Sequence, residues 1–457
     1  MFRLFSCCGK KSTAVIDVVG DKSVAASDAP AVTAKNNGKI PWRYRLFGRP
    51  LTKINCIKNE KQSIITDSKP KKTATKPRWW CSWKKRCKVA PSPEEQSREE
   101  ESDGTPHQAQ VVDLQGQAEE EEQQTNDCSK TLKTLRHQQF CCLGLPNPVQ
   151  ICYMNSCLQS LLTLEDFIRD LDQQEQVWSL DPDSTIIKAL MDISRSHFSV
   201  DRHHKLCLLA AFKKAVSLWN PEFKDLHQKD AHEFLTSVLD QMRCLGQQLQ
   251  VLASSIGSTY SCPVEGHLVF KMQNTRTCKS CGAESTREEE FTHLSLDLVP
   301  AHGTVQQMLE HYLIETELDF TCECGATTSG QRSSFINLPR VLVLHLKRFR
   351  FSPTLELTKD NDPVVLSRDL VVPSSQGGGC YSLVSTINHI GGTVTSGHYI
   401  SDGVDPDVGQ EDPTDRWFTY NDAVVTETSG ASVCERRERF SYILFYTRRV
   451  REQNCHM

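Results

Sequence analysis

The sequence predicts an α+β protein in which a helical segment presents a cysteine and a β-rich segment presents a histidine. Apolar residues recur at helical spacing over Leu158–Leu171, directly after Cys152, and again over Ala231–Met242. Farther along, Tyr381–Ile387 alternates as a strand does and precedes the turn-prone pair Gly391-Gly392. Because the helical patterns precede the strand patterns, we expect a helical lobe followed by a β-rich lobe.

Cys152 stands in the first turn of the first predicted helix. At that place the helix dipole and the free backbone amides favour a thiolate, which is the nucleophilic form of cysteine. The alternative is that Cys152 is a small buried hydrophobic residue, as many intracellular cysteines are. A catalytic thiol needs a base within hydrogen-bond reach and a third group that orients the base, and both can lie far away in sequence.

Candidates for these two partners stand more than 200 residues downstream. His398 follows Gly397 on a strand that returns from a turn, and its ordinary pKa suits proton transfer near neutrality. Asn421 and Asp422 follow an aromatic strand-like segment. The alternatives are a structural histidine and an ordinary Asn-Asp turn. His389 is kept out of the catalytic set, and we expect it to be structural.

Residues 144–156 read GLPNPVQICYMNS. This stretch resembles the cysteine box of ubiquitin-specific proteases, G-L-x-N-x-G-N-T-C-Y-x-N-S. The resemblance implies that Cys152 is the nucleophile and that Asn147, five residues earlier, donates to the oxyanion. A side-chain amide beside the cysteine's backbone amide would stabilise the oxygen of a tetrahedral intermediate. A turn residue before a proline is the alternative reading of Asn147.

Three residues of this box depart from the family pattern: Val149 replaces Gly, Gln150 replaces Asn and Ile151 replaces Thr. Glycine reaches backbone angles that a β-branched residue resists. If the loop needs a positive φ at position 149, we expect a distorted oxyanion hole and reduced turnover.

Two later segments resemble the family's histidine and Asn/Asp segments. Ser396–Ile400 reads SGHYI, which implies that His398 is the catalytic base. Trp417–Val424 reads WFTYNDAV, in which the first residue of the amide-acid pair orients the histidine in the family. Asn421 takes that place, and Cys-His-Asn triads are an accepted variant. Asp422 is the second candidate, as a support for the oxyanion or the histidine.

A fourth segment, His227–Leu235, resembles the family's Q-Q-D-A-x-E-F-L helix start. The resemblance implies that Asp230 and Glu233 grip an arginine near the ubiquitin C-terminus, which carboxylates do well through charge-assisted bonds. Helix capping is the competing role for Asp230. Two strands resemble the family's core, Leu338–Phe349 and Tyr442–Tyr446, and we expect His345, on the first of them, to be structural.

These matches follow the family's order over residues 144–446, about two thirds of the chain, and the chain is identified as a member of the ubiquitin-specific proteases. The resemblance implies a papain-like ubiquitin-specific protease fold with a helical thumb, a β-rich palm and a finger subdomain. It also implies a deubiquitinase that cleaves after the C-terminal glycine of ubiquitin with no catalytic cofactor, so the partners are ubiquitin and ubiquitinated proteins. The alternative, suggested by the three departures, is a catalytically impaired ubiquitin-binding protein.

Two cysteine pairs have the spacing of a structural zinc site. Cys278 and Cys281 form a C-x-x-C pair, and Cys322 and Cys324 form a C-x-C pair about forty residues later. Four thiolates would close a tetrahedral site, and the resemblance implies the same metal at the tip of the fingers. The second pair is one residue shorter than in the family, so the alternative is a degenerate site with reduced cysteines.

Charge divides the region before the predicted domain. Residues 1–90 hold 21 basic and 5 acidic residues, a net charge of +16, whereas residues 93–127 hold 1 basic and 12 acidic residues, a net charge of −11. We therefore expect residues 1–137 to be a disordered basic-then-acidic tail, 138–449 the catalytic domain and 450–457 a short C-terminal tail. Trp79, Trp80 and Trp83 among basic residues suggest a docking motif, while nucleic-acid binding is not expected.

The 20 cysteines do not predict disulfides, because no signal peptide is recognisable at the start of the sequence. We therefore expect reduced thiols and an intracellular protein, cytoplasmic or nuclear. No apolar run reaches membrane-spanning length. Cys7 and Cys8 beside Lys10 and Lys11 are weak candidates for palmitoylation, because no myristoylation glycine follows Met1.

Overall fold

The computed structural model describes residues 142–449, except 353, 394–395 and 406–414. The predicted N-terminal tail, residues 138–141 of the predicted domain and the C-terminal tail lie outside the described residues. The same is true of the docking and palmitoylation segments proposed within the N-terminal tail.

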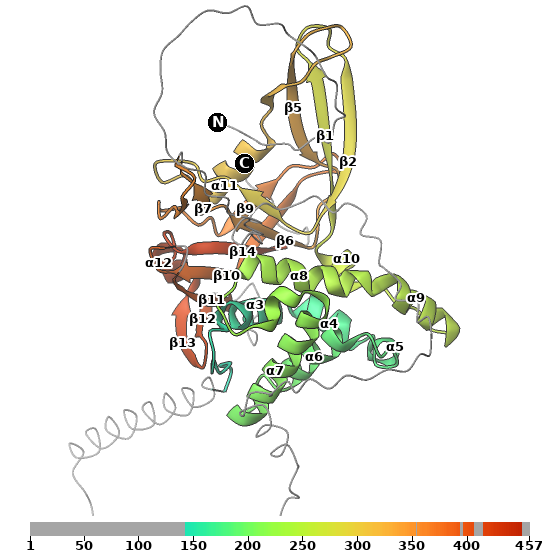
Figure 1. Ribbon diagram of the computed structural model, residues 1–457, viewed down its shortest axis with the longest axis vertical. Coiled ribbons are helices and arrows are strands. Elements are labelled where there is room, and N and C mark those ends of the chain that lie inside the picture. Colours follow the sequence, from blue (N-terminus) through green and yellow to red (C-terminus); the bar gives the residue numbers. More distant parts are fainter. Residues whose placement is uncertain (1–141, 353, 394–395, 406–414, 450–457) are drawn as a thin grey trace, which may run out of the picture. The chain divides into compact units, whose positions relative to one another are not determined.

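Helices dominate the first half of the described chain, and Figure 1 shows most of them gathered on one side of a large sheet. No helix in this part of the chain combines the length and the hydropathy needed to cross a membrane. The α-helices are α3 (Cys152–Leu162), α4 (Glu165–Asp172), α5 (Glu175–Trp178), α6 (Thr185–Arg195), α7 (Arg202–Trp219), α8 (Ala231–Cys244), α9 (Gly246–Ser255), α10 (Pro263–His267), α11 (Val305–Leu313) and α12 (Gly430–Arg436), and Pro221–Lys224 forms the 3-10 helix η2.

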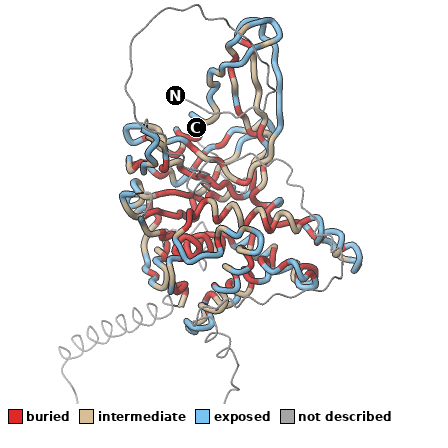
Figure 2. Tube along the Cα trace, viewed as in Figure 1, coloured by how far each residue is buried: buried red, intermediate tan, exposed pale blue. Residues whose placement is uncertain are grey.

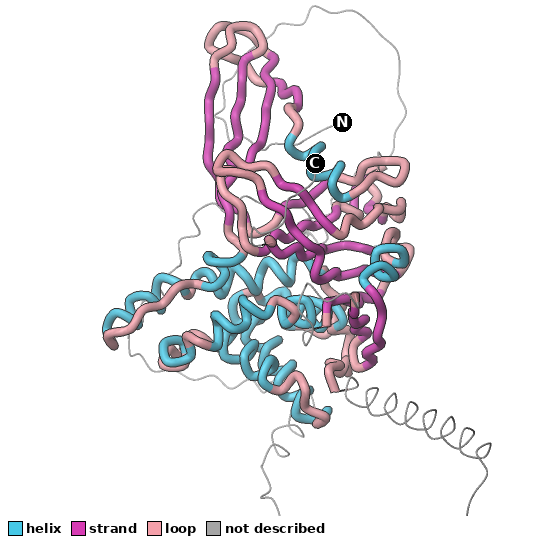
Figure 3. Tube along the Cα trace, turned by 180° about the vertical axis from the view of Figure 1, so that it is seen from behind, coloured by secondary structure: helices cyan, strands magenta, loops and turns pink. Residues whose placement is uncertain are grey.

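Strands dominate the second half, and Figure 3 shows their separation from the helices from behind. They are β1 (Phe270–Cys278), β2 (Glu284–Phe291), β3 (Leu294–Leu296), β4 (Thr316–Asp319), β5 (Thr328–Phe335), β6 (Val341–Leu346), β7 (Phe349–Phe351), β8 (Leu357–Lys359), β9 (Asp369–Val372), β10 (Gly379–Ile390), β11 (His398–Val404), β12 (Arg416–Asn421), β13 (Val424–Ser429) and β14 (Ser441–Arg448). The division into helical and β-rich lobes confirms the predicted α+β class.

The strands form two principal sheets. One sheet has eight strands in the order β13-β12-β11-β10-β14-β6-β3, with β9 also paired to β10. Its pairs are antiparallel except β3 with β6. The other has four strands in the order β2-β1-β5-β4, and β7 and β8 form a separate hairpin. The predicted strands Leu338–Phe349 and Tyr442–Tyr446 lie within this architecture as β6 with β7 and as β14.

Helix α3 lies between the large sheet and the other helices, and packs on β11 and on α8. Every residue from Cys152 to Leu161 is buried, as the red tube in Figure 2 shows at the centre of the molecule. The sequence predicted one apolar face, but the helix is enclosed on all sides. Its polar side chains are satisfied internally, because Ser160 accepts from Ser385 at 3.0 Å and Gln159 donates to the Leu143 carbonyl at 2.8 Å.

The apolar spacing from Leu158 to Leu171 belongs to two helices, since α3 ends at Leu162 and α4 starts at Glu165. Leu164 stands between them at the N-cap of α4 and is buried, so the periodic pattern continues across a break in the backbone. By contrast, α8 is one helix over the predicted stripe, whose residues all lie in the core.

A buried lysine anchors the segment that leads into α3. The Lys205 side chain on α7 is 4% exposed and donates to the carbonyls of Cys142, Gly144 and His197. Burial lowers the pKa of Lys205 to about 8, because the charged form loses its hydration. The bonds from Lys205 to the Cys142 and Gly144 carbonyls fix the path of the chain before it turns toward Cys152.

Candidate active site

Cys152 is the first residue of α3, as the sequence predicted, and its side chain opens into a pocket of about 670 Å³. The preceding loop is tied to the helix start, because the Asn147 Oδ1 accepts from the Ile151 amide at 3.1 Å. The N-cap residue, Ile151, makes no capping hydrogen bond through its side chain. The free amides and the helix dipole therefore act on whatever negative charge forms at or near the sulfur.

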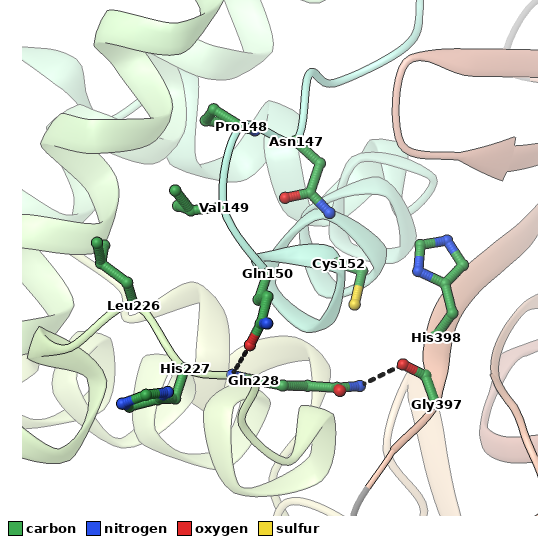
Figure 4. Close-up of a pocket in the computed structure, with 10 residues that line it drawn as sticks. All are labelled: Asn147, Pro148, Val149, Gln150, Cys152, Leu226, His227, Gln228, Gly397 and His398. Atoms are coloured by element: carbon green, nitrogen blue, oxygen red, sulfur yellow. Dashed lines mark hydrogen bonds between the residues drawn. The ribbon is translucent and has the colours of Figure 1, made fainter.

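His398 begins β11 and faces Cys152 across the pocket (Figure 4). Its Nε2 lies 2.7 Å from the Asn421 Oδ1, so the other ring nitrogen is the one left for the thiol. A hydrogen bond with Cys152 is the largest cause that raises the pKa of His398 to about 9, and the bond to Asn421 also raises it. The structure thus brings together Cys152, His398 and Asn421 in the order that nucleophilic catalysis requires.

Asn421 and Asp422 lie at a tight turn between β12 and β13. Asn421 pairs with Val424, so Asp422 and Ala423 form a two-residue connection. Asp422 has a φ of 51°, a left-handed conformation that aspartate tolerates better than most residues. The turn aims the amide of Asn421 at His398, and the Asp422 Oδ2 lies 3.7 Å from the same imidazole nitrogen.

The carboxylate of Asp422 also reaches the cysteine loop. Its Oδ2 accepts from the Asn147 Nδ2 at 2.9 Å, and its Oδ1 accepts from the Asn155 Nδ2 at 2.8 Å. The backbone takes part as well, since the Leu145 amide donates to the Asp422 carbonyl at 2.9 Å. Asp422 therefore joins the loop that carries the nucleophile to the turn that orients the base.

Gly144 allows this close approach. A Cβ at position 144 would lie 2.4 Å from the Ala423 carbonyl oxygen, a distance that side chains do not reach. The glycine of the predicted cysteine box is thus required by the contact between the box and the β12–β13 turn.

Val149 is not among the described residues with a positive φ, so the condition under which a distorted loop was expected at this position is not met. The effect of Val149 on turnover stays a prediction. A residue with a negative φ gains nothing from the freedom of glycine. Val149 lines the pocket, and Ile151 is buried at the N-cap of α3.

Two neighbouring glutamines that the sequence reasoning assigned no role line the pocket. The Gln150 Oε1 accepts from the Gln228 amide at 3.1 Å, and the Gln228 Nε2 donates to the Gly397 carbonyl at 2.8 Å. Figure 4 shows both bonds as dashed lines below the Cys152 sulfur. The signal that could have found Gln228 is its position in the segment that starts α8, two residues before Asp230.

Asp230 is the N-cap of α8. Its Oδ1 accepts from the amides of His232 and Glu233 at 2.8 and 3.0 Å, and its Oδ2 accepts from the Tyr442 hydroxyl at 2.7 Å and the Tyr399 hydroxyl at 3.4 Å. The side chain is buried, which raises the pKa of its carboxyl, while the four donors oppose that shift. Glu233 is half-buried in the first turn of α8. Neither residue lines the pocket that contains Cys152, so their substrate role stays a prediction.

The four predicted metal ligands gather at one end of the four-stranded sheet. The Sγ atoms of Cys278, Cys281, Cys322 and Cys324 all lie within 4.8 Å of one another. Cys278 and Cys324 are 3.7 Å apart, and so are Cys281 and Cys322. A tetrahedral zinc with Zn–S bonds of about 2.3 Å has S···S edges of about 3.8 Å, so the donor set fits this ion. The shorter C-x-C spacing does not prevent the gathering.

Removal of the Cys152 sulfur is expected to lower the pKa of His398 from about 9 toward its ordinary value, because the bond to Cys152 is the largest cause of the rise. The measurement is an NMR titration of the His398 ring in Cys152→Ala. Cys157→Ala is the matched control, since the Cys157 thiol is buried and donates to the Ala231 carbonyl. A His398 that titrates equally in both variants would contradict the contact.

Comparison with known proteins agrees with this geometry. Residues 143–446 match the family model described as ubiquitin carboxyl-terminal hydrolase. The chain is similar to ubiquitin carboxyl-terminal hydrolase 37 of Canis lupus familiaris, with 34% identity over 259 residues that cover 52% of this chain and 26% of that protein. It is also similar to ubiquitin carboxyl-terminal hydrolase 26 of Homo sapiens, with 32% identity over 259 residues that cover 51% and 28%. The chain thus spans about a quarter of the length of the curated relatives it matches.

Solved structures show the same fold. The SAGA DUB module of Ubp8, Sgf11, Sus1 and Sgf73 bound to monoubiquitin matches with a TM-score of 0.58 and 24% identity, covering 69% of this chain and 71% of that chain. The module bound to ubiquitin aldehyde matches with a TM-score of 0.58 and 23% identity over the same shares. The predicted ubiquitin-specific protease fold is therefore confirmed. The matched span holds the cysteine loop, the histidine strand and the Asn-Asp turn, and it covers about two thirds of the sequence, so the chain belongs to the ubiquitin carboxyl-terminal hydrolase family.

Proposed function

We propose that the chain is a cysteine-dependent deubiquitinase that cleaves the bond after the C-terminal glycine of ubiquitin. The observation that carries the proposal is that Cys152 and His398 line one open pocket while Asn421 accepts from the His398 ring, and the family match supports it. The names of the relatives and the ubiquitin-bound neighbours support ubiquitin as the substrate. Ubiquitin and ubiquitinated proteins are then the partners.

The proposed reaction begins at the contact of Cys152 with His398. The imidazole takes the thiol proton, and the thiolate attacks the carbonyl of the terminal glycine. Because the pKa of His398 is raised, the ring keeps this proton until it donates it to the leaving amine. Asn421 fixes the ring through its Oδ1. The C–N bond breaks as the amine leaves with the proton from His398, and a thioester then joins Cys152 to ubiquitin. Water attacks this thioester with His398 as the base, the C–S bond breaks, the Cys152 thiolate leaves, and ubiquitin is released with a free carboxylate.

The oxyanion would be held at the start of α3. The Cys152 backbone amide lies at the helix N-terminus, and Asn147 lines the pocket beside it. The Asn147 amide uses one of its two hydrogens on Asp422, which leaves the other for the oxyanion. Because Asp422 holds Asn147 in place, its proposed role is to position this donor and to add negative charge near His398.

The first test is labelling with a ubiquitin derivative that carries a C-terminal electrophile. The wild-type chain is expected to form a covalent adduct, Cys152→Ala to form none, and Cys157→Ala to react normally, because Cys157 is buried and outside the pocket. Mobility on a denaturing gel reads the result. A wild-type chain that binds ubiquitin without forming the adduct would instead support the alternative of an impaired binding protein.

A second test separates the roles of Asp230 and Glu233. Asp230→Ala is expected to lower the free energy of unfolding by about 2 kcal/mol, because it removes a helix cap and leaves the tyrosine hydroxyls without their acceptor. Glu233→Gln is expected to retain stability and to lower kcat/KM on ubiquitin substrates about tenfold, if it meets an arginine of the tail. Denaturant unfolding and steady-state kinetics on both variants measure this. Normal turnover in Glu233→Gln would remove it from the substrate site.

We also propose that the four-cysteine cluster holds one structural zinc ion, which would tie the two cysteine turns together and supply no catalytic chemistry. Elemental analysis of purified protein is expected to find about one zinc per chain. Cys324→Ser should lower the zinc content and the melting temperature, while Cys434→Ser, outside the cluster, should leave the zinc content unchanged. Absence of zinc, with a melting temperature indifferent to chelator, would identify a vestigial site.

An intracellular location remains part of this proposal. The thiols of Cys152, Cys157 and the metal cluster are free, which a reducing compartment preserves. Cys380 is disulfide-bonded, so the expectation that all cysteines are reduced is wrong at this residue. Docking of the N-terminal segment on a partner remains a prediction from the sequence.

A further inference from the structure

The active-site cleft is crossed by a chain of two hydrogen bonds, which we call the glutamine strap. It runs from the Gln150 side chain to the Gln228 backbone, and from the Gln228 side chain to the Gly397 carbonyl. The strap connects the cysteine loop, the segment before α8 and the residue before His398. All three of its residues line the pocket that contains Cys152 and His398 (Figure 4).

The Gly397 carbonyl is an acceptor placed next to the catalytic histidine. A flexible peptide tail that delivers its last carbonyl carbon to Cys152 must satisfy its own backbone N–H groups nearby, because the cleft removes water from them. In the structure this acceptor is taken by the Gln228 Nε2 at 2.8 Å. A primary carboxamide and a peptide N–H are both N–H donors, so the side chain of Gln228 makes the kind of bond that a substrate amide could make at this carbonyl.

The nucleophile is little exposed in the free enzyme. Cys152 lines the pocket but is only 3% exposed. The Gln228 side chain is half-buried, and Figure 4 shows it extended below the sulfur toward Gly397. A tail amide that reaches the Gly397 carbonyl from the side of Gln228 would displace the Gln228 side chain from it.

We propose that Gln228 is an intramolecular competitor of the substrate tail: its carboxamide holds the Gly397 carbonyl in the free enzyme and gives it up when the tail binds. This inference rests on the proposed deubiquitinase function for the identity of the tail. Gln150 supports the competitor by accepting from the Gln228 backbone amide, and it stands where the family pattern has the shorter asparagine. The strap thus sets how readily the free enzyme admits a substrate.

The test removes the donor from the strap in two ways. Gln228→Ala shortens the side chain, and Gln228→Met keeps its length but cannot donate to Gly397. In both variants, alkylation of Cys152 by iodoacetamide is expected to accelerate about three- to tenfold, the factor that one hydrogen bond represents. Peptide mapping by mass spectrometry isolates the Cys152 signal from that of the other cysteines. Gln247→Ala, on the exposed side of α9, is the matched control and should alkylate as the wild type does.

Steady-state kinetics on a ubiquitin–fluorophore substrate then test the competition itself. Loss of a competitor is expected to lower KM by a similar factor, with kcat within about twofold of the wild type, because the triad is untouched. A raised KM in Gln228→Ala would show that Gln228 binds the substrate, and it would overturn the inference. Unchanged alkylation in both Gln228 variants would also overturn it.

The two proposals fail in distinguishable ways. If no variant and no wild-type preparation turned over ubiquitin, the proposed function would fall and competition with a ubiquitin tail would fall with it. Alkylation of Cys152 is independent of ubiquitin, so it still reports whether Gln228 shields the nucleophile. Faster alkylation without a change in KM would reject competition while ubiquitin turnover stands.

Discussion

The carboxylate of Asp422 is the interaction on which the candidate site depends. The cysteine loop comes from the helical lobe and the histidine from the sheet, so their relative position needs a direct connection. Asp422 provides it by accepting from Asn147 and Asn155 while its neighbour Asn421 contacts His398. Hydrogen bonds to an ionised acceptor are roughly twice as strong as neutral ones, so a carboxylate is well able to hold the two lobes together at this contact.

The different contacts of Asn421 and Asp422 follow from the geometry of the turn. Asn421 is the last residue of β12 and Asp422 stands in the left-handed conformation directly after it. Their side chains therefore point to different partners, the amide to the imidazole and the carboxylate to the cysteine loop. A neutral residue orients the base, and the carboxylate of Asp422 lies 3.7 Å from the ring nitrogen, outside direct hydrogen-bond contact. The raised pKa of His398 accordingly comes first from Cys152.

Much of this arrangement could be predicted from the sequence, because the relevant residues lie in short motifs with strong local patterns. The start of α3 at Cys152, the strand before His398 and the Asn-Asp turn are local features that periodicity and turn chemistry reveal. The glutamine strap could not be predicted, since Gln228 contacts residues 78 and 169 positions away through side-chain geometry. The strain considered at Val149 depended on a positive φ, which this residue does not adopt, because a family glycine need not occupy a conformation that only glycine tolerates. The burial of α3 on all sides could not be predicted either. Its polar residues Gln159 and Ser160 resemble a solvent-facing side until their hydrogen-bond partners are known.

The cysteine cluster has a consequence for how the four-stranded sheet folds. Cys278 and Cys281 lie where β1 turns toward β2, and Cys322 and Cys324 lie between β4 and β5. The contacts join positions 46 and 41 residues apart, and the β1–β5 pairing that they border joins Met272 to Phe335. Such non-local pairing is slow because the loop between the strands must close before any contact forms. A metal captured by the four thiolates would close that loop early, so the cluster would govern the speed at which this sheet assembles as well as its final stability.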